Sequence, residues 1–151
     1  MSDPSADLGT RRSPEPSQDA ERPLVRLGLP EAAHELLAMV GFLTAPDGPL
    51  REVAATGRPS DLHRRVLVKA LERADVIANF LRGRISFFMT WRHQDPGSYS
   101  VELELAGSTL AASRALALVI DRLLGGALPA EAEFDQLGDA ALRIYAALET
   151  L

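Results

Sequence analysis

Apolar residues recur at helical spacing along most of the chain. They repeat every three or four positions, which is typical of helices that bury one face. Ser60 is a good N-cap for the clearest of these helices, and Gly83 supplies its expected C-terminal stop. The helix over 110–124 is apolar on nearly every side, so we expect other elements to cover it. The pattern predicts helices over about 30–43, 60–82, 110–124 and 130–151, with a short helix near 50–55.

Between the second and third long helices, the spacing changes from helical to alternating. Apolar side chains occupy every second position from Ile85 to Trp91, and again from Tyr99 to Leu105. Two alternating runs around a Pro-Gly turn are typical of an antiparallel β-hairpin with one buried face. The sequence therefore predicts an α+β fold in which helices pack on a central antiparallel β-hairpin. A two-stranded sheet alone is marginal, and residues 24–29 are a candidate third strand.

The first part of the chain has a different composition. Residues 1–23 hold four prolines among Ser, Asp, Glu and Arg, and Leu8 is their only large aliphatic side chain after Met1. Such a segment buries too little apolar area to offset the entropy lost on ordering. We therefore expect a disordered tail over 1–23, acting as a solubilising leader or carrying a partner-binding motif, and a single α+β domain over 24–151.

Composition and charge narrow the class of protein. Hydrophobic residues make up 46% and charged residues 25% of the 151 residues, which is typical of a globular domain. The net charge of -5 argues against nucleic-acid binding through bulk charge, and the longest apolar run, 115–120, is too short to span a membrane. The absence of Cys fits a reducing cytosol, and Lys69 is the only lysine among 16 basic residues, which suggests a high-GC bacterial source. We expect a cytoplasmic bacterial protein without a membrane span.

Candidate chemistry in the sequence is sparse. The histidines His34, His63 and His93 each lack a second histidine at metal-ligand spacing. His93 and Asp95 fall in the predicted hairpin turn, where turn chemistry is the simpler interpretation. No nucleophile elbow, phosphate-binding loop or dinucleotide fingerprint occurs. The sequence therefore predicts no catalytic, metal-binding or cofactor-binding residue, and it argues against an enzyme. The alternative is a small-ligand-binding or enzymatic domain with a pocket between the hairpin and the helices.

One segment resembles a known family. The run Ile120-Asp121-Arg122-Leu123-Leu124-Gly125-Gly126 is similar to the helix end of flagellar motor-switch proteins of the FliM type. It resembles, more loosely, the related CheC-type chemotaxis phosphatases. Residues 81–85 are similar to the helix-to-strand step of that family, and 131–139 to the acidic segment that opens its next helix. The resemblance covers about residues 60–150. It implies a strand pair between two helices and a partner in a chemotaxis, motor-switch or related secretion assembly.

The chain departs from the phosphatase members of that family. Those members carry a Glu-x-x-Asn pair that orients water onto a phospho-aspartate. This chain has Glu72-Arg73-Ala74-Asp75 in the matching helix, and Arg143-Ile144-Tyr145-Ala146 in its last helix. An Asp in place of the carboxamide brings negative charge towards an anionic phosphoryl group, which opposes the reaction. The resemblance therefore does not imply phosphatase activity for this chain.

The last two helices carry more apolar surface than one hairpin can cover. An apolar stripe left open in a domain of this size usually marks a protein–protein surface, and Tyr145 is an amphipathic residue of the kind that interfaces favour. We therefore expect a non-catalytic protein-interaction or adaptor domain whose partner is another protein or a second copy of the chain, as in a homodimer. The alternative is that the stripe folds back onto the helix that begins near 60. The predicted interface residues are Ile144, Tyr145, Leu148 and Leu151.

Overall fold

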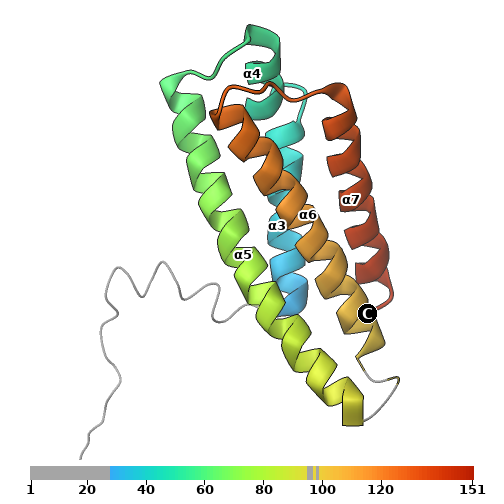
Figure 1. Ribbon diagram of the computed structural model, residues 1–151. Helices are drawn as coiled ribbons and strands as arrows, with labels where there is room; N and C mark the ends of the chain where they lie inside the picture. Colours follow the sequence, from blue (N-terminus) through green and yellow to red (C-terminus); the bar gives the residue numbers. More distant parts are fainter. Residues whose placement is uncertain (1–27, 95–96, 98) are drawn as a thin grey trace, which may run out of the picture.

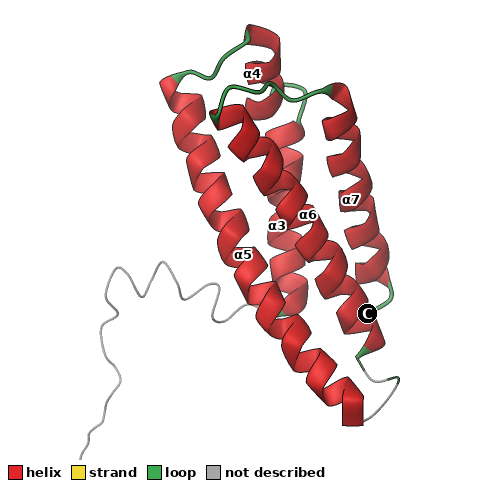
Figure 2. Cartoon of the chain, viewed as in Figure 1, coloured by secondary structure: helices red, strands yellow, loops and turns green. Residues whose placement is uncertain are grey.

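The computed structural model describes residues 28–94, 97 and 99–151, and every regular element in these ranges is a helix (Figure 2). The helices are α3 (Leu29–Thr44), α4 (Pro49–Thr56), α5 (Asp61–Gln94), α6 (Ser100–Leu124) and α7 (Glu131–Glu149). The predicted α+β fold with a central β-hairpin is therefore wrong, because the described residues contain no strand.

The four long helices form an up-and-down bundle. Figure 1 shows α3 and α6 running in one direction and α5 and α7 in the other, with the short helix α4 at the upper end. Helix α6 packs against α5, α7 and α3, whereas α4 packs against α3 and α5. The two edges of the bundle are α5 and α7, and α3 and α6 lie between them (Figure 1).

The core runs along the axis of the bundle and is built almost entirely from aliphatic side chains. Helix α6 is covered on several sides, as its sequence predicts. The largest fully buried side chains are Leu36, Leu43, Leu50, Leu67, Ile77, Leu81, Leu105, Leu116, Ile120, Leu123, Leu137 and Ile144. Because they come from all five helices, removing any helix would expose part of one continuous core.

The most extensive contact in the bundle joins α5 and α6. Small side chains permit a close approach: Ala74 and Ala78 are buried on α5, and Ala106 is buried two turns before Ser113 on α6. The Ser113 hydroxyl donates a buried hydrogen bond of 2.7 Å to the carbonyl oxygen of Ala74. A hydroxyl at this position would be costly to bury without a partner, so the bond also favours one register between the two helices.

Ser60 caps α5, which confirms the prediction. Its Oγ accepts a hydrogen bond of 3.1 Å from the backbone N–H of His63, and its own N–H donates to His63 Nδ1 at 3.2 Å. The other ring nitrogen of His63 lies 3.0 Å from Glu52 Oε1, which links the start of α5 to α4. The histidine therefore has a structural role at the upper end of the bundle.

A second set of contacts ties α4 and α6 to the start of α7. Arg51 pairs with Glu131 at 3.2 Å, and its guanidinium lies 3.8 Å from the centre of the Phe134 ring. Arg122, in the last turn of α6, pairs with Glu133 at 2.9 Å. These contacts fix the loop between α6 and α7, where Gly126 has a φ of 105° that favours glycine.

The segments predicted as a β-hairpin belong to the two longest helices. Residues 85–91 continue α5, and residues 100–105 form the first turns of α6. Gly83, predicted to end the helix that begins near 60, lies inside α5, and Gly107 lies inside α6. Extending a helix that already exists requires no new nucleus, and one interior glycine costs only about 1 kcal/mol. The alternative, a two-stranded hairpin, is only marginally stable when no further strand lies beside it.

The reversal of the chain at this point is predicted correctly. The chain turns back between Gln94 and Ser100, and Gly97 has a φ of 95°. Residues 95, 96 and 98 lie outside the described residues, as do His93's side chain and the predicted tail over 1–23. The candidate strand over 24–29 lies outside them up to residue 27, whereas Gly28 is the N-cap of α3 and Leu29 begins that helix.

Helix α6 is the one described helix with the length and mean hydropathy of a membrane span. It packs against α3, α5 and α7 in the bundle. A helix covered on several sides by protein needs the same apolar composition as one covered by lipid. The packing thus accounts for its composition, and the absence of a membrane span stays a prediction.

The continuity of α5 can be tested at Gly83. This residue is exposed inside the helix, and a Cβ added there would meet no atom within 4 Å. We expect Gly83→Ala to raise the free energy of unfolding by about 0.5–1 kcal/mol, measured by urea denaturation. Gly126→Ala is the matched control, and it should destabilise the protein because its φ is positive. A loss of stability at Gly83 would indicate that the helix ends there.

Candidate functional site

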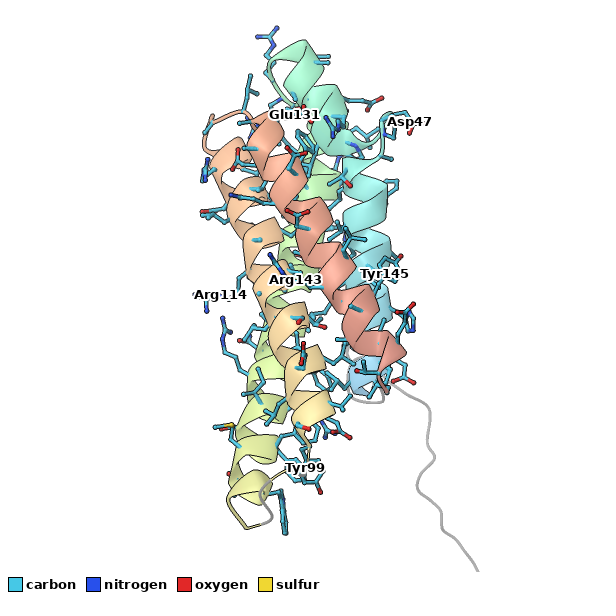
Figure 3. The ribbon with its side chains drawn as sticks, turned by 90° about the vertical axis from the view of Figure 1, so that its right-hand side faces the viewer. Asp47, Tyr99, Arg114, Glu131, Arg143 and Tyr145 are labelled. Atoms are coloured by element: carbon cyan, nitrogen blue, oxygen red, sulfur yellow. The ribbon has the colours of Figure 1, made fainter. Side chains whose placement is uncertain are left out.

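The four residues predicted as an interface do not share one exposed face. Ile144 is fully buried in the core, and Leu148 is half-buried against it. Tyr145 and Leu151 are each 53% exposed. The buried positions lie on the side of α7 that faces α3 and α6, whereas Tyr145 lies on the outer part of the helix (Figure 3). A contact with a partner could involve Tyr145 and Leu151, but Ile144 already contacts the chain's own core.

A different group of large apolar side chains is exposed near the C-terminal end of α5. Phe87, Met89 and Trp91 are 44%, 53% and 45% exposed. We call these three residues the aromatic end. As strand residues they were expected to face the core, but the helix directs them to solvent. Phe87 and Trp91 lie four residues apart on one side of the helix and Met89 lies on the other, and exposed apolar side chains of this size are typical of a binding surface.

The aromatic end projects because α5 is longer than the helices around it. With 34 residues it spans about 50 Å, whereas the 16 residues of α3 and the 19 of α7 span about 24 and 29 Å. Figure 1 shows the lower end of α5 continuing past α3 and α7. Among the described helices, only the first turns of α6 accompany it, so no described helix covers its other sides.

Three residues support the aromatic end from beneath. Phe88 is buried, and its ring stacks on that of Tyr99 with centres 5.2 Å apart. The guanidinium of Arg84 lies 5.1 Å from the Phe88 ring centre and 5.5 Å from that of Phe87. The Phe87 ring in turn lies 6.1 Å from that of Trp91. The exposed rings therefore rest on a packed base that already restricts their conformations. They lose less conformational entropy when they bind a partner.

Tyr99 holds this base in place through an unusual backbone conformation. It precedes the first turn of α6 with a φ of 64°, and its carbonyl oxygen accepts a hydrogen bond of 2.8 Å from the N–H of Leu103. Few residues other than glycine adopt such a φ. The stacking on Phe88 compensates for part of the strain, which explains a tyrosine at this position.

An open apolar groove of about 390 Å³ lies between α3 and α5. Met39 and Val66 line its sides, and Phe42, which is 59% exposed, stands at its rim. Arg73 also lines the groove, and its Nε and Nη2 both donate to the Glu35 carboxylate, the second at 2.8 Å. This hydrogen bonding raises the pKa of Arg73 above its ordinary value, although partial burial lowers it. The Arg73 guanidinium therefore stays charged, and its hydrogen bonds to Glu35 join α3 to α5.

A second open groove, of about 660 Å³, lies between α5 and α6. Leu118 is 54% exposed in it, and Asp75, Arg114 and Asp121 are polar residues of its lining. Figure 3 shows Arg114 pointing away from the bundle. Glu72 and Asp75, at the positions compared with the phosphatase pair, are both exposed to solvent. The groove therefore has the character of an ordinary solvent-facing surface between two helices.

The described residues offer little for catalysis. No three His, Asp or Glu side chains among them are placed to hold a metal ion. His63 is committed to the cap of α5, and His34 is exposed on α3. Comparison with protein-family models, curated proteins and solved structures finds no match for this chain. The exposed surfaces are therefore the features from which a function can be inferred.

The two adjacent phenylalanines provide a test of this arrangement. Phe88→Ala should lower the free energy of unfolding by about 3–5 kcal/mol, because it leaves a cavity beneath the aromatic end. Phe87→Ala should lower it by less than about 1 kcal/mol, because nearly half of this side chain is already in water. Urea denaturation of both variants measures the difference. Equal losses, or a larger loss at Phe87, would favour the predicted strand, in which Phe87 faces the core.

Proposed function

We propose that this chain is a non-catalytic protein-interaction domain that binds its partner through the aromatic end. The observation that carries this proposal is the exposure of Phe87, Met89 and Trp91 together at the projecting end of α5. Aromatic residues and Met are enriched at the centres of protein interfaces, where a few such anchors supply most of the binding free energy.

The geometry of the aromatic end favours a concave partner. Phe87 and Trp91 are four residues apart and share one side of the helix, whereas Met89 is two residues from each and points to the other side. A flat surface could cover only one of these sides. A socket between the helices or sheets of another protein could bury both.

Charge at the base of the aromatic end favours an acidic rim on that socket. Arg82 is exposed and donates to Asn79 at 2.8 Å, and Arg84 lies beneath the exposed rings. The Nε of Arg84 is buried and finds no hydrogen-bond partner among the described residues. Carboxylates on the rim of the partner's socket would pair with the exposed Arg82 and, on the other side of the helix, with the part of the half-buried Arg84 guanidinium that reaches solvent.

Two other interpretations have less support. A small-ligand or enzymatic site would need an enclosed pocket with convergent polar groups. The grooves beside α5 are open. The segments predicted to form a hairpin along such a pocket are helical. A partner in a chemotaxis, motor-switch or secretion assembly rests on the resemblance of residues 60–150 alone and stays a prediction.

The proposal is tested with the chain's only tryptophan, Trp91, as the reporter. A photo-crosslinking amino acid at position 89 captures the partner in cells of the source organism, and the purified partner is then titrated into the wild-type chain. We expect a saturable blue shift of the Trp91 emission as the ring leaves water. Phe87→Ala should weaken binding by about tenfold or more, because it removes one anchor.

Phe42→Ala is the matched control, because Phe42 is exposed to a similar degree but lies near the upper end of α3. This variant should bind like the wild type. Equal binding by Phe87→Ala would contradict the proposal. The same emission is also measured with vesicles of phosphatidylcholine and phosphatidylglycerol. If vesicles shift the Trp91 emission to the blue and no protein partner does so, the aromatic end is a lipid-binding surface instead.

A further inference from the structure

The outer side of α5 is open above the aromatic end as well. Helix α5 forms one edge of the bundle and packs on α3 and α6, and no described helix lies against its opposite side (Figure 1). We call the side chains exposed over the first half of the helix the α5 outer face. They are Asp61, Leu62, Arg64, Arg65, Val68, Lys69, Glu72, Asp75, Val76 and Asn79.

The charges of the α5 outer face are arranged in order along the helix. Its three cations lie over 64–69, two acids follow over 72–75, and one further acid at position 61 begins the helix. None of these six side chains forms an ion pair with another residue that the structure describes. A face that is first basic and then acidic is complementary to a second copy of itself that runs in the opposite direction.

The same antiparallel arrangement also brings apolar side chains together. In two identical antiparallel helices related by a two-fold axis, residues lie opposite each other when the midpoint between their positions falls on the axis. Two oppositely charged pairs and one apolar pair share such a midpoint. Three pairs have midpoints within half a residue of position 69: Arg64 with Asp75, Arg65 with Glu72, and Leu62 with Val76.

Val68 and Lys69 lie closest to this axis. Val68 is 40% exposed and lines a shallow depression of about 300 Å³ together with Arg64, Arg65 and Glu72. Across the axis Val68 would meet its own copy, so both side chains would leave water. Lys69 would also face its copy, but Glu72 of the other helix lies only about 5 Å farther along, within reach of the long lysine side chain.

We propose that two copies of this chain form a symmetric dimer through the α5 outer face, with the two α5 helices antiparallel and the two-fold axis near position 69. Charge complementarity identifies the second copy as the occupant, because the order of charges on this face matches its own reverse. Such a contact is isologous: each copy contributes the same surface, and the assembly closes at two copies.

The contact combines weak ion pairs with a small apolar area. Ion pairs that stay in water are individually weak and are screened by salt. Leu62 and Val76 are 64% and 38% exposed, and they add apolar surface beside the charges. Dimerisation should therefore be modest in affinity and should weaken as salt is raised.

This contact does not include the aromatic end. It ends near Asn79, whereas the aromatic end begins at Phe87. In the dimer the two copies of Trp91 would lie about 65 Å apart, at opposite ends of the assembly. The dimer does not depend on the proposed function, but together they give a bivalent molecule that can bind two partners at once.

Analytical ultracentrifugation of the full chain tests the proposal. In about 0.1 M salt, the average mass should rise with protein concentration from that of one chain towards that of two. In about 1 M salt, where the Debye length is about 3 Å, the dimer should dissociate at lower dilution. A mass of one chain at every concentration up to about 1 mM, or growth beyond two chains, would overturn the proposal.

Charge reversal then identifies the surface. The triple variant Arg64→Glu/Arg65→Glu/Lys69→Glu is acidic throughout this face, and the double variant Glu72→Lys/Asp75→Lys is basic over 64–75. Each alone should dimerise at least about tenfold more weakly than the wild type, because like charges then meet. An equimolar mixture should regain dimers with one copy of each. A chain with all five reversals should also regain them, since its charges again match their own reverse.

The matched control reverses two acids on the opposite edge of the bundle. Asp135→Lys/Asp139→Lys lies on α7 and should dimerise like the wild type. Circular dichroism checks that every variant folds, and the chain with all five reversals keeps the test decisive if a partial variant does not fold. A folded chain of this kind that stays monomeric would overturn the proposal. Phe87→Ala should dimerise normally, and a loss of dimers there would instead place the contact at the aromatic end.

Discussion

The antiparallel packing of α5 against α6 is the contact on which the rest of the structure depends. The hydrogen bond from Ser113 to the carbonyl oxygen of Ala74 favours one register, and small buried side chains let the two helices approach closely. Helices α3 and α7 pack on this pair without reaching its full length. The same contact therefore produces both the continuous core in the upper part of the bundle and the projecting section that carries the exposed aromatic side chains.

Much of the helical core could be predicted from the sequence, because the helices that line it follow a regular spacing. The alternating pattern over 85–91 predicts a strand wrongly, because the exposed Phe87, Met89 and Trp91 add apolar residues outside the buried stripe of the helix. A signal for the helix was present nonetheless. Leu81, Ile85 and Phe88 continue the stripe of Ala74 and Ile77 at spacings of three and four residues.

The candidate surfaces were harder to predict for a different reason. A stripe of apolar residues on the last helix shows that one side is buried, but not how far α3 and α6 cover its flanks. Ile144 therefore looked equivalent to Tyr145, although the structure buries the first and exposes the second. The composition of the aromatic end is recognisable in the sequence, but its exposure follows from the greater length of α5 compared with α3. The sequence of one helix does not show how far the neighbouring helix extends beside it.

The unequal helix lengths also divide the molecule into parts of different local stability. Where four helices overlap, an amide can exchange with solvent only if much of the core opens. In the section where α5 has only α6 beside it, opening exposes the Phe88–Tyr99 stack and few other contacts. Amide hydrogen exchange should therefore be faster around Phe88 than around Ile77, on the same helix. The exposed aromatic side chains thus belong to the part of the protein that can rearrange without unfolding the whole.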